Sequence, residues 1–255
     1  GFFDVIGFII LQVVLVFEKI FIFIPWFVWI PLIGFAGWKL VKSWKSGLSF
    51  MIMLFLIGSF GYWELSMITI SLVIASVFFS LIIGIPLGIV MARNDRAESI
   101  IKPLLDGMQT MPSFVYLIPA LMFFGMGKVP ALFATIIYAV PPVIRLTNVG
   151  IRTVDKEAVE ASRAFGATPK QVLFDVQLPL AKPAIMVGIN QTTMMALAMV
   201  VIGSMIGAKG LGMEVLLAIN RIEIGQGFEA GISIVFLAII VDRITFSFSV
   251  KGKKL

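Results

Sequence analysis

Long apolar runs separated by short charged segments make up almost the whole chain. A helix needs about 20 consecutive apolar residues to cross the hydrocarbon core of a bilayer. Residues 2–17 form a run of marginal length that ends at Glu18 and Lys19, and it fits a truncated span or a helix in the membrane interface. The pattern predicts an all-α, polytopic membrane helix bundle with clear spans at residues 20–38, 47–63, 67–91, 103–126, 129–149, 183–206 and 228–249.

Residues 151–182 are the one long segment without this apolar character. Thr153 is a suitable N-cap for a helix that starts at Val154, and Asp155 is favourable in its first turn. Gly166 stands where a helix C-cap belongs. At helical spacing, one face of this helix carries Val154, Ala158, Ala161 and Phe165.

A second short helix is expected after Gly166. Thr168 is a cap residue and Pro169 suits the first helical position. Pro179 is expected to end this helix, because the residue before a proline is disfavoured in the helical conformation. The segment therefore predicts two short helices at a sharp angle, held outside the bilayer between two spans.

The composition narrows the function. Hydrophobic residues are 60% of the chain and charged residues only 13%, about half the share of a soluble domain. The absence of Cys and His excludes thiol nucleophiles, disulfides and Cys/His metal sites. No phosphate-binding loop of the Gly-x4-Gly-Lys-Ser/Thr type is present. We expect no catalytic residue, no metal site and no nucleic-acid partner despite the net charge of +6.

The placement of basic residues predicts the topology. If every clear span crosses once, the side that holds residues 151–182 carries fifteen Lys and Arg, and the opposite side carries four, Lys19, Lys128, Lys209 and Arg221. The positive-inside rule places the richer side in the cytoplasm. The fifteen are Lys39, Lys42, Lys45, Arg93, Arg96, Lys102, Arg145, Arg152, Lys156, Arg163, Lys170, Lys182, Lys251, Lys253 and Lys254.

The polar segment resembles a known motif. Glu160-Ala161-Ser162, then Gly166, then Leu178-Pro179 is similar to the EAA loop of permease subunits in binding-protein-dependent ABC importers, with Ser162 as a mild departure from the motif. The resemblance implies a coupling helix that docks on an ATPase subunit. The residues it assigns to this contact are Glu157, Ala158, Glu160, Ala161, Arg163, Phe165 and Gly166.

Residues 106–119, 190–201, 206–212 and 242–244 resemble the permease subunit of glycine betaine/proline ABC importers. This implies a type I importer core of five transmembrane helices in residues 64–250, with the coupling loop at 151–182 and scaffold helices in residues 1–63. It further implies a permease homodimer, an extracytoplasmic substrate-binding protein or domain, and ATP with Mg on the partner ATPase rather than on this chain. The expected location is a bacterial or archaeal cytoplasmic membrane, in contact with its lipid.

Polar and aromatic residues inside the spans are candidates for a solute path. Hydrogen bonding between helices is an equally good explanation for the polar ones. An ion-coupled secondary transporter of small zwitterions remains an alternative, although few ionisable groups lie in the spans, and so does a channel or structural subunit. The candidate path residues are Gln109, Met111, Pro112, Tyr116, Asn190, Gln191 and Thr193.

Overall fold

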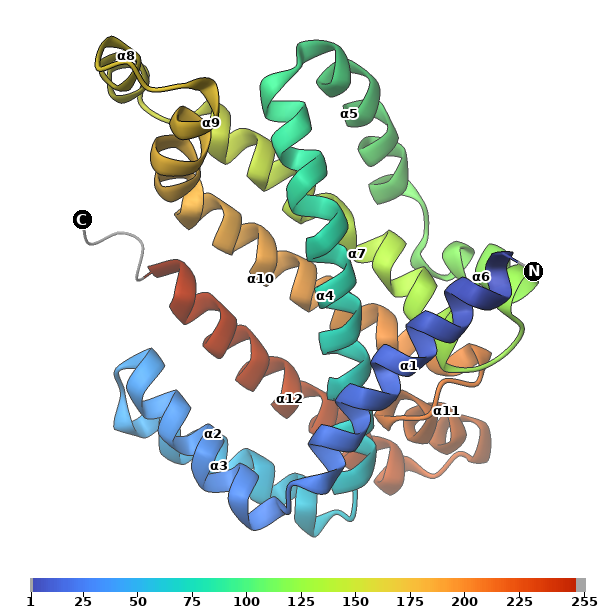
Figure 1. The fold of residues 1–255 in the computed structure, drawn as a ribbon. Helices are drawn as coiled ribbons and strands as arrows, with labels where there is room; N and C mark the ends of the chain where they lie inside the picture. Colours follow the sequence, from blue (N-terminus) through green and yellow to red (C-terminus); the bar gives the residue numbers. More distant parts are fainter. Residues whose placement is uncertain (1, 251–255) are drawn as a thin grey trace.

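The computed structural model describes residues 2–250, so Lys251, Lys253 and Lys254 of the charge count lie outside the described residues. The described chain is helical almost throughout, which confirms the all-α prediction (Figure 1). In order, the elements are α1 (Phe2–Phe23), α2 (Trp26–Val41), α3 (Trp44–Ser59), α4 (Trp63–Arg93), α5 (Asp95–Thr110), η1 (Ser113–Tyr116), α6 (Leu117–Phe124), α7 (Lys128–Arg152), α8 (Lys156–Ala164), α9 (Pro169–Gln171), η2 (Val172–Gln177), α10 (Leu178–Ile202), η3 (Gly203–Ile206), α11 (Leu211–Arg221) and α12 (Ile224–Val250).

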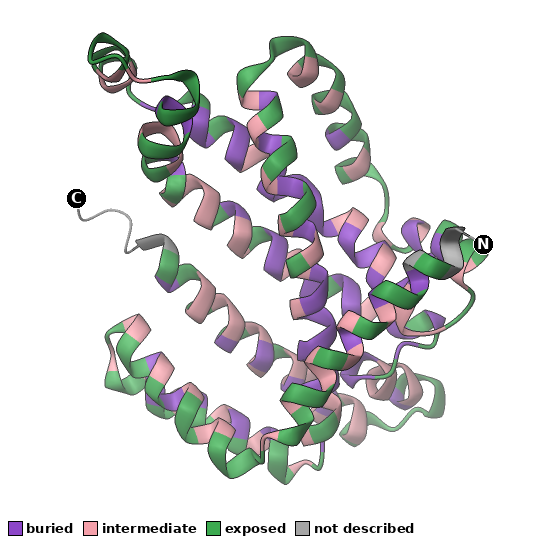
Figure 2. Ribbon diagram, in the orientation of Figure 1, coloured by how far each residue is buried: buried purple, intermediate pink, exposed green. Residues whose placement is uncertain are grey.

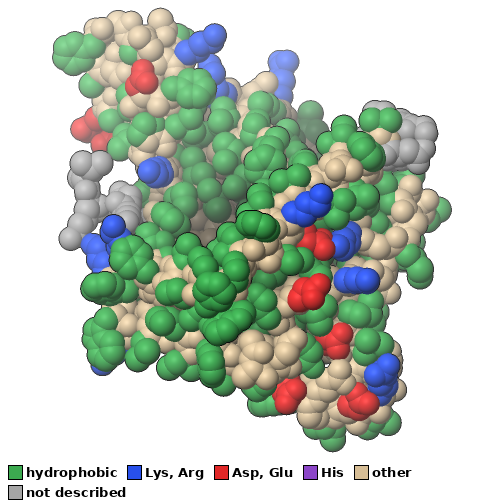
Figure 3. All heavy atoms as spheres, turned by 60° about the horizontal axis from the view of Figure 1, so that its bottom comes forward, with side chains coloured by type: hydrophobic (Ala, Val, Ile, Leu, Met, Phe, Trp, Pro, Cys, Tyr) green, Lys and Arg blue, Asp and Glu red, His purple; other side chains and the backbone are tan. Residues whose placement is uncertain are grey.

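Four helical stretches in the described residues are long and apolar enough to cross a membrane. They are α4, α7, most of α12, and the continuous stretch Pro169–Ile206 that contains α10. These confirm the spans predicted near residues 67–91, 129–149, 183–206 and 228–249. Helix α7 packs against both α4 and α10, and its middle is buried (Figure 2). Hydrophobic side chains cover much of the face seen in Figure 3, as a lipid-facing surface requires.

Two glycines allow α4 and α7 to approach closely. A Cβ built at Gly84 would lie 2.4 Å from Val143 Cγ1, and one at Gly88 would lie 2.6 Å from Thr147 Cβ and 2.7 Å from the carbonyl oxygen of Ile144. Small residues four positions apart are typical of tight helix pairs in membranes, where packing rather than the hydrophobic effect drives association. The α4–α7 contact therefore depends on the absence of side chains at these positions.

The span predicted at residues 103–126 is not one straight helix. Helix α5 begins already at Asp95, and Asn94 caps it by accepting the N–H groups of Arg96 and Ala97 at 3.0 and 3.3 Å. The chain then bends by 110° into residues 113–124. Pro112 lies in this bend, and a proline at the end of a helix favours an extended residue before it; Met111 is extended.

The N-terminal prediction is also corrected. Helix α1 does not end at Glu18 but continues to Phe23 and bends by 97° into α2, so residues 20–38 are a corner rather than one span. Glu18 is tolerated within the helix because its carboxylate pairs with Lys128 Nζ of α7 at 2.5 Å. Helices α2 and α3 pack against each other and against α12.

The segment between the predicted spans at residues 183–206 and 228–249 contains the helix α11. Thr69 Oγ1 accepts the buried N–H of Leu211, the first residue of α11, at 2.9 Å. Gly210 has φ +150°, a value that favours glycine, and this brings the backbone against Thr69. The hydroxyl itself donates to Leu65 O at 2.8 Å. Thr69 therefore fastens α11 to α4.

We expect Thr69→Val to lower the free energy of unfolding by about 1–3 kcal/mol, because it leaves the buried Leu211 N–H without an acceptor while keeping the side-chain volume. The measurement is thermal unfolding of the purified protein in detergent. Thr69→Ser keeps the hydroxyl and serves as the control. Equal unfolding temperatures for the Val and Ser variants would contradict the role of this hydrogen bond.

Candidate functional site

Helix α8 starts two residues later than predicted. Asp155 is its N-cap, with Oδ1 accepting the N–H of Glu157 at 2.9 Å. Thr153 instead closes α7, because its hydroxyl donates to Val149 O at 2.8 Å and is not free to cap the next helix. Val154 is buried between the two helices. The short connection leaves little freedom between the end of α7 and the start of α8.

Gly166 ends α8 as predicted. Its φ is +86°, its N–H donates to Arg163 O at 2.9 Å, and the N–H of Ala167 donates to Ser162 O at 3.1 Å. This pair of bonds is the Schellman motif, which requires a left-handed residue that glycine adopts without strain. A Cβ at Gly166 would meet nothing within 4 Å. Within this chain, glycine is needed for its backbone conformation and not for space.

The face of α8 that carries Val154, Ala158, Ala161 and Phe165 is buried only near its start. The inward residue is Val159, which packs with Val154 against a cluster that contains Ile151, Leu173 and Ala181. Ala158 is half-buried and Ala161 is exposed. Phe165, predicted on the same face as Val154, is 92% exposed. The helix therefore presents most of its surface outward (Figure 2).

Most of the predicted docking residues share this outward surface. Within residues 2–250 the carboxylate of Glu160 has no hydrogen bond or ion pair, so it is available to a partner. It lines a shallow groove of about 250 Å³ together with Arg152, Lys156 and Arg163. The exposed members of the predicted set are Glu157, Glu160, Ala161, Arg163, Phe165 and Gly166.

The second helix of the loop begins as predicted and ends elsewhere. Thr168 and Gln171 form a capping box at the start of α9. Pro179 does not stop the helix, which continues through the π-helical segment η2 into α10. Leu178 N–H donates to Leu173 O, five residues earlier. This wider turn relieves the clash that a proline ring makes with the carbonyl four residues before it. The loop is thus joined to α10 by continuous helix.

The candidate path residues on α5 and η1 divide into two groups. Gln109, Met111 and Pro112 are exposed at the α5–η1 bend. Tyr116 is buried, donates its hydroxyl to Met108 O, and packs its ring edge-on to Tyr138 with centroids 5.9 Å apart. Tyr116 therefore supports the bend and does not line an open path.

The candidates on α10 divide in the same way. Asn190 donates to Asp242 Oδ1 at 3.0 Å and accepts from the Thr245 hydroxyl, so it joins α10 to α12. Thr193 donates to Ile189 O at 2.7 Å within its own helix. Gln191 alone of the three is exposed. Hydrogen bonding inside the bundle accounts for Asn190 and Thr193.

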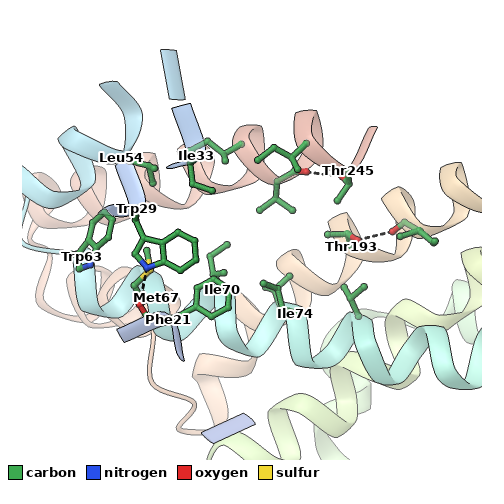
Figure 4. Close-up of a pocket in the computed structure, with 16 residues that line it drawn as sticks. Phe21, Trp29, Ile33, Leu54, Trp63, Met67, Ile70, Ile74, Thr193 and Thr245 are labelled. Carbon is green, nitrogen blue, oxygen red and sulfur yellow. Dashed lines mark hydrogen bonds between the residues drawn. The ribbon is translucent and has the colours of Figure 1, made fainter. Parts of the chain in front are cut away.

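An apolar cavity of about 350 Å³ lies between the N-terminal helices and the core helices α4, α10 and α12 (Figure 4). Its polar contributors are the hydroxyls of Thr193 and Thr245, and both donate to carbonyls of their own helices at 2.7 Å. A zwitterion would lose its hydration here without new hydrogen bonds, at a cost of several kcal/mol. The hydroxyls of this lining therefore offer a zwitterion no free hydrogen-bond donor.

The sequence analysis missed a polar seam between α5 and α7. Arg145 pairs with Asp106 at 2.5 Å, and Arg152 pairs with Glu98 at 3.0 Å and with Asp95 at 2.7 Å. A signal was present in the spacing. Charged or amide residues recur at successive spacings of three, four and four residues on α5 and of three and four residues on α7, which places each set on one helical face. The residues are Asp95, Glu98, Lys102 and Asp106 on α5, and Arg145, Asn148 and Arg152 on α7.

Residues 84–250, about two thirds of the chain, match the family described as binding-protein-dependent transport system inner membrane component. The chain belongs to this family. It is a multi-pass inner membrane permease and not itself an enzyme. A permease of a binding-protein-dependent ABC importer works with a substrate-binding protein and an ATPase, and the outward surface of α8 is available for such a contact.

Several curated relatives are similar over most of the permease. It is 50% identical to the glycine betaine/carnitine transport permease protein GbuB of Listeria monocytogenes serotype 1/2a (strain 10403S), over 99% of this chain and 91% of that protein. It is 49% identical to the glycine betaine/proline betaine transport system permease protein ProW of Escherichia coli (strain K12), over 90% of this chain and 64% of that protein. The glycine betaine transport system permease protein OpuAB of Bacillus subtilis (strain 168) is 50% identical over 78% of this chain and 70% of that protein.

Solved structures share the fold of the permease at low sequence identity. A chain of the MetNI methionine ABC transporter in an inward-facing conformation matches with a TM-score of 0.65 and 20% identity, over 73% of this chain and 93% of that one. A chain of an amino acid ABC transporter crystallised with histidines matches with a TM-score of 0.59 and 23% identity, over 74% of this chain and 92% of that one. The predicted type I importer fold is confirmed.

Proposed function

We propose that the permease carries glycine betaine and related quaternary ammonium osmoprotectants across the membrane as part of an ATP-driven importer, with α8 as the coupling helix. The observation that carries this proposal is the capped, outward-facing α8, which is fastened closely to α7 at one end and to α10 by continuous helix after Gly166. The relatives named for glycine betaine transport supply the substrate class.

The geometry supports a specific coupling mechanism. A partner ATPase, which binds the ATP and Mg, contacts the exposed residues of α8. When the ATPase subunits close, α8 moves with them. Few flexible residues separate α8 from α7, and the helix from Pro169 to Ile206 is unbroken, so the displacement tilts both spans. This tilt changes the side of the membrane to which the solute path opens, and hydrolysis reverses it.

A second copy of the permease completes the proposed path. The apolar cavity of Figure 4 gives a zwitterion no charged partner, whereas large apolar side chains stand exposed on η1, α6, the turn after α6, and η3. Such a surface suits a protein contact as well as lipid. In the proposed homodimer this face meets its equivalent, and residues 64–250 form the core while residues 1–63 lie outside it. The exposed residues are Phe114, Ile118, Met122, Met126 and Met205.

The test is reconstitution of the permease with its co-purified ATPase and binding protein in proteoliposomes. We expect betaine uptake only with ATP inside or on the ATPase side, and ATP hydrolysis stimulated at least fivefold by betaine-loaded binding protein. An ion-coupled secondary transporter would instead show uptake driven by a proton or sodium gradient without ATP. A channel or structural subunit would show no solute-stimulated hydrolysis. Either result would overturn the proposal.

A further inference from the structure

A four-residue cluster joins the end of α7 to the start of α5. Arg152 Nη2 donates to Asp95 Oδ1 and to the backbone oxygen of Met91 at 2.7 and 2.8 Å and forms an ion pair with Glu98 Oε2 at 3.0 Å, and its Nε donates to Asn148 Oδ1 at 3.0 Å. Asn148 Nδ2 donates in turn to Glu98 Oε1 at 2.9 Å. One guanidinium therefore holds three segments together: the last turn of α4, the first turn of α5 and the last turns of α7. We call Arg152, Asn148, Glu98 and Asp95 the Arg152 cluster.

The side chains of this cluster differ in their exposure to solvent. The less exposed contacts are the stronger ones, because solvent screens them less. Asn148 is buried, and the side chains of Glu98 and Arg152 are 28% and 32% exposed. Asp95 is 89% exposed, so solvent screens its attraction to Arg152. The bonds among Arg152, Asn148 and Glu98 therefore form the firm part of the link.

The cluster stands next to the coupling helix in sequence. Arg152 is the last residue of α7, Thr153 closes that helix, and Asp155 caps α8. A displacement of α8 reaches Arg152 before it reaches the rest of α7. In Figure 1, α8 and the α4–α5 junction lie at the same end of the molecule.

A movement of the Arg152 cluster is transmitted along α5 to the Arg145–Asp106 pair near the other end of this helix. The Arg145–Asp106 pair attaches α5 to α7 a second time, three turns along α5, and Leu105 beside it is 2% exposed against α7 and α4. Helix α5 then ends at Thr110 and turns by 110° through Met111 and Pro112. The α5–η1 bend holds three exposed candidates for the solute path, Gln109, Met111 and Pro112.

We propose that Arg152 is a positioning residue that transmits the displacement of α8 to α5 and so to the α5–η1 bend, a route separate from the tilting of α7 and α10. This rests on the proposed coupling function of α8. The guanidinium suits the role because its planar fork bonds several acceptors in fixed geometry, whereas a lysine presents one flexible point charge. Loss of the fork frees α5 from α8 and leaves the exposed side chains of α8 itself unchanged.

The experiment follows α5 and the loop separately in the reconstituted complex. The chain contains no cysteine, so a single introduced cysteine can carry an environment-sensitive fluorophore. Thr110→Cys reports the end of α5, and Lys170→Cys reports the coupling loop from an exposed position outside the docking set. In the otherwise unaltered permease we expect ATP to change the fluorescence at both positions.

Arg152→Gln is expected to leave the ATP response at position 170 within twofold, to reduce the response at position 110 at least fivefold, and to lower the ratio of solute transported to ATP hydrolysed at least tenfold. Arg152→Lys should fall between the two. Arg96→Gln is the matched control, because Arg96 is exposed on the first turn of α5 and its guanidinium has no hydrogen bond or ion pair within residues 2–250. Glu98→Gln tests the same link if Arg152→Gln does not accumulate in membranes.

A response at position 110 that stays within twofold in Arg152→Gln, with a normal transport ratio, would overturn the proposal and leave the coupling role of α8 intact. The absence of any ATP response at position 170 in the unaltered permease would overturn the coupling role itself, and this proposal with it. The two failures are therefore distinguishable by the position at which the response is lost.

Discussion

Gly166→Asp is expected to abolish uptake while the permease remains folded in the membrane. Aspartate tolerates the left-handed conformation better than most residues, and the strain costs about 1 kcal/mol. A side chain at this position meets no other atom of the chain within 4 Å. It projects instead beside the exposed Phe165, on the surface proposed to enter the ATPase. We expect uptake in proteoliposomes to fall at least twentyfold, with membrane content and unfolding temperature close to those of the unaltered protein.

Gly61→Asp is the matched control for this prediction. Gly61 has φ +80°, is exposed, and has no neighbour within 4 Å of a built Cβ, so the local strain is the same. It lies in the turn between α3 and α4, at the end of α4 that is remote from α8 (Figure 1). We expect normal uptake in this variant. Equal uptake by the Gly61 and Gly166 variants would refute docking through the C-terminal end of α8.

Gly88→Val is expected to have the largest effect on stability. The new Cβ would lie 2.7 Å from the Ile144 carbonyl oxygen and 2.6 Å from Thr147 Cβ, both on the rigid helix α7. Because backbone atoms cannot move aside as a side chain can, α4 and α7 must separate. Overpacking of this kind costs about 3 kcal/mol. The measurement is the unfolding temperature in detergent, together with the fraction of monodisperse protein after size-exclusion chromatography.

The control for Gly88→Val is the same substitution at Gly231 in α12. A Cβ at Gly231 has no neighbour within 4 Å, so this substitution changes the free energy of unfolding only through helix propensity. Helix propensity slightly favours Val over Gly. We expect its unfolding temperature to be unchanged or slightly raised. If Gly88→Val unfolds at the same temperature as Gly231→Val, the close α4–α7 approach does not determine stability.

The apolar pattern predicted straight spans well and corners badly. α4, α7, α10 and α12 were located because each is a long apolar run, and this signal is local. Residues 20–38 and 103–126 have the same composition but fold into sharp bends, since Pro25 and Pro112 outweigh the hydropathy of the residues around them. Glu18 was read as the end of a helix because its partner, Lys128, is 110 residues away.

The coupling loop shows the same division between local and distant information. Gly166 and the capping box at Thr168 were predicted because the bonds that define them lie within a few residues. The orientation of Phe165 was not predicted, because it depends on how α8 packs against α7. The continuation of the helix through Pro179 was not predicted either, because it depends on a widened turn. The Arg152 cluster was missed because its two halves are 50 or more residues apart, although the spacing of charges on each half was visible.

The π-helical segment η2 has a consequence for how chain length varies among homologous permeases. Its turn accommodates one more residue than an α-helical turn of the same rise. Deleting a single residue from Val172–Gln177 would convert it to regular α-helix and leave the azimuth of everything beyond Leu178 nearly unchanged. Homologues whose segment between Gly166 and Gly188 is one residue shorter can therefore present the same face of α10 to α7. A one-residue gap in an alignment at this point would leave the packing of these helices unchanged.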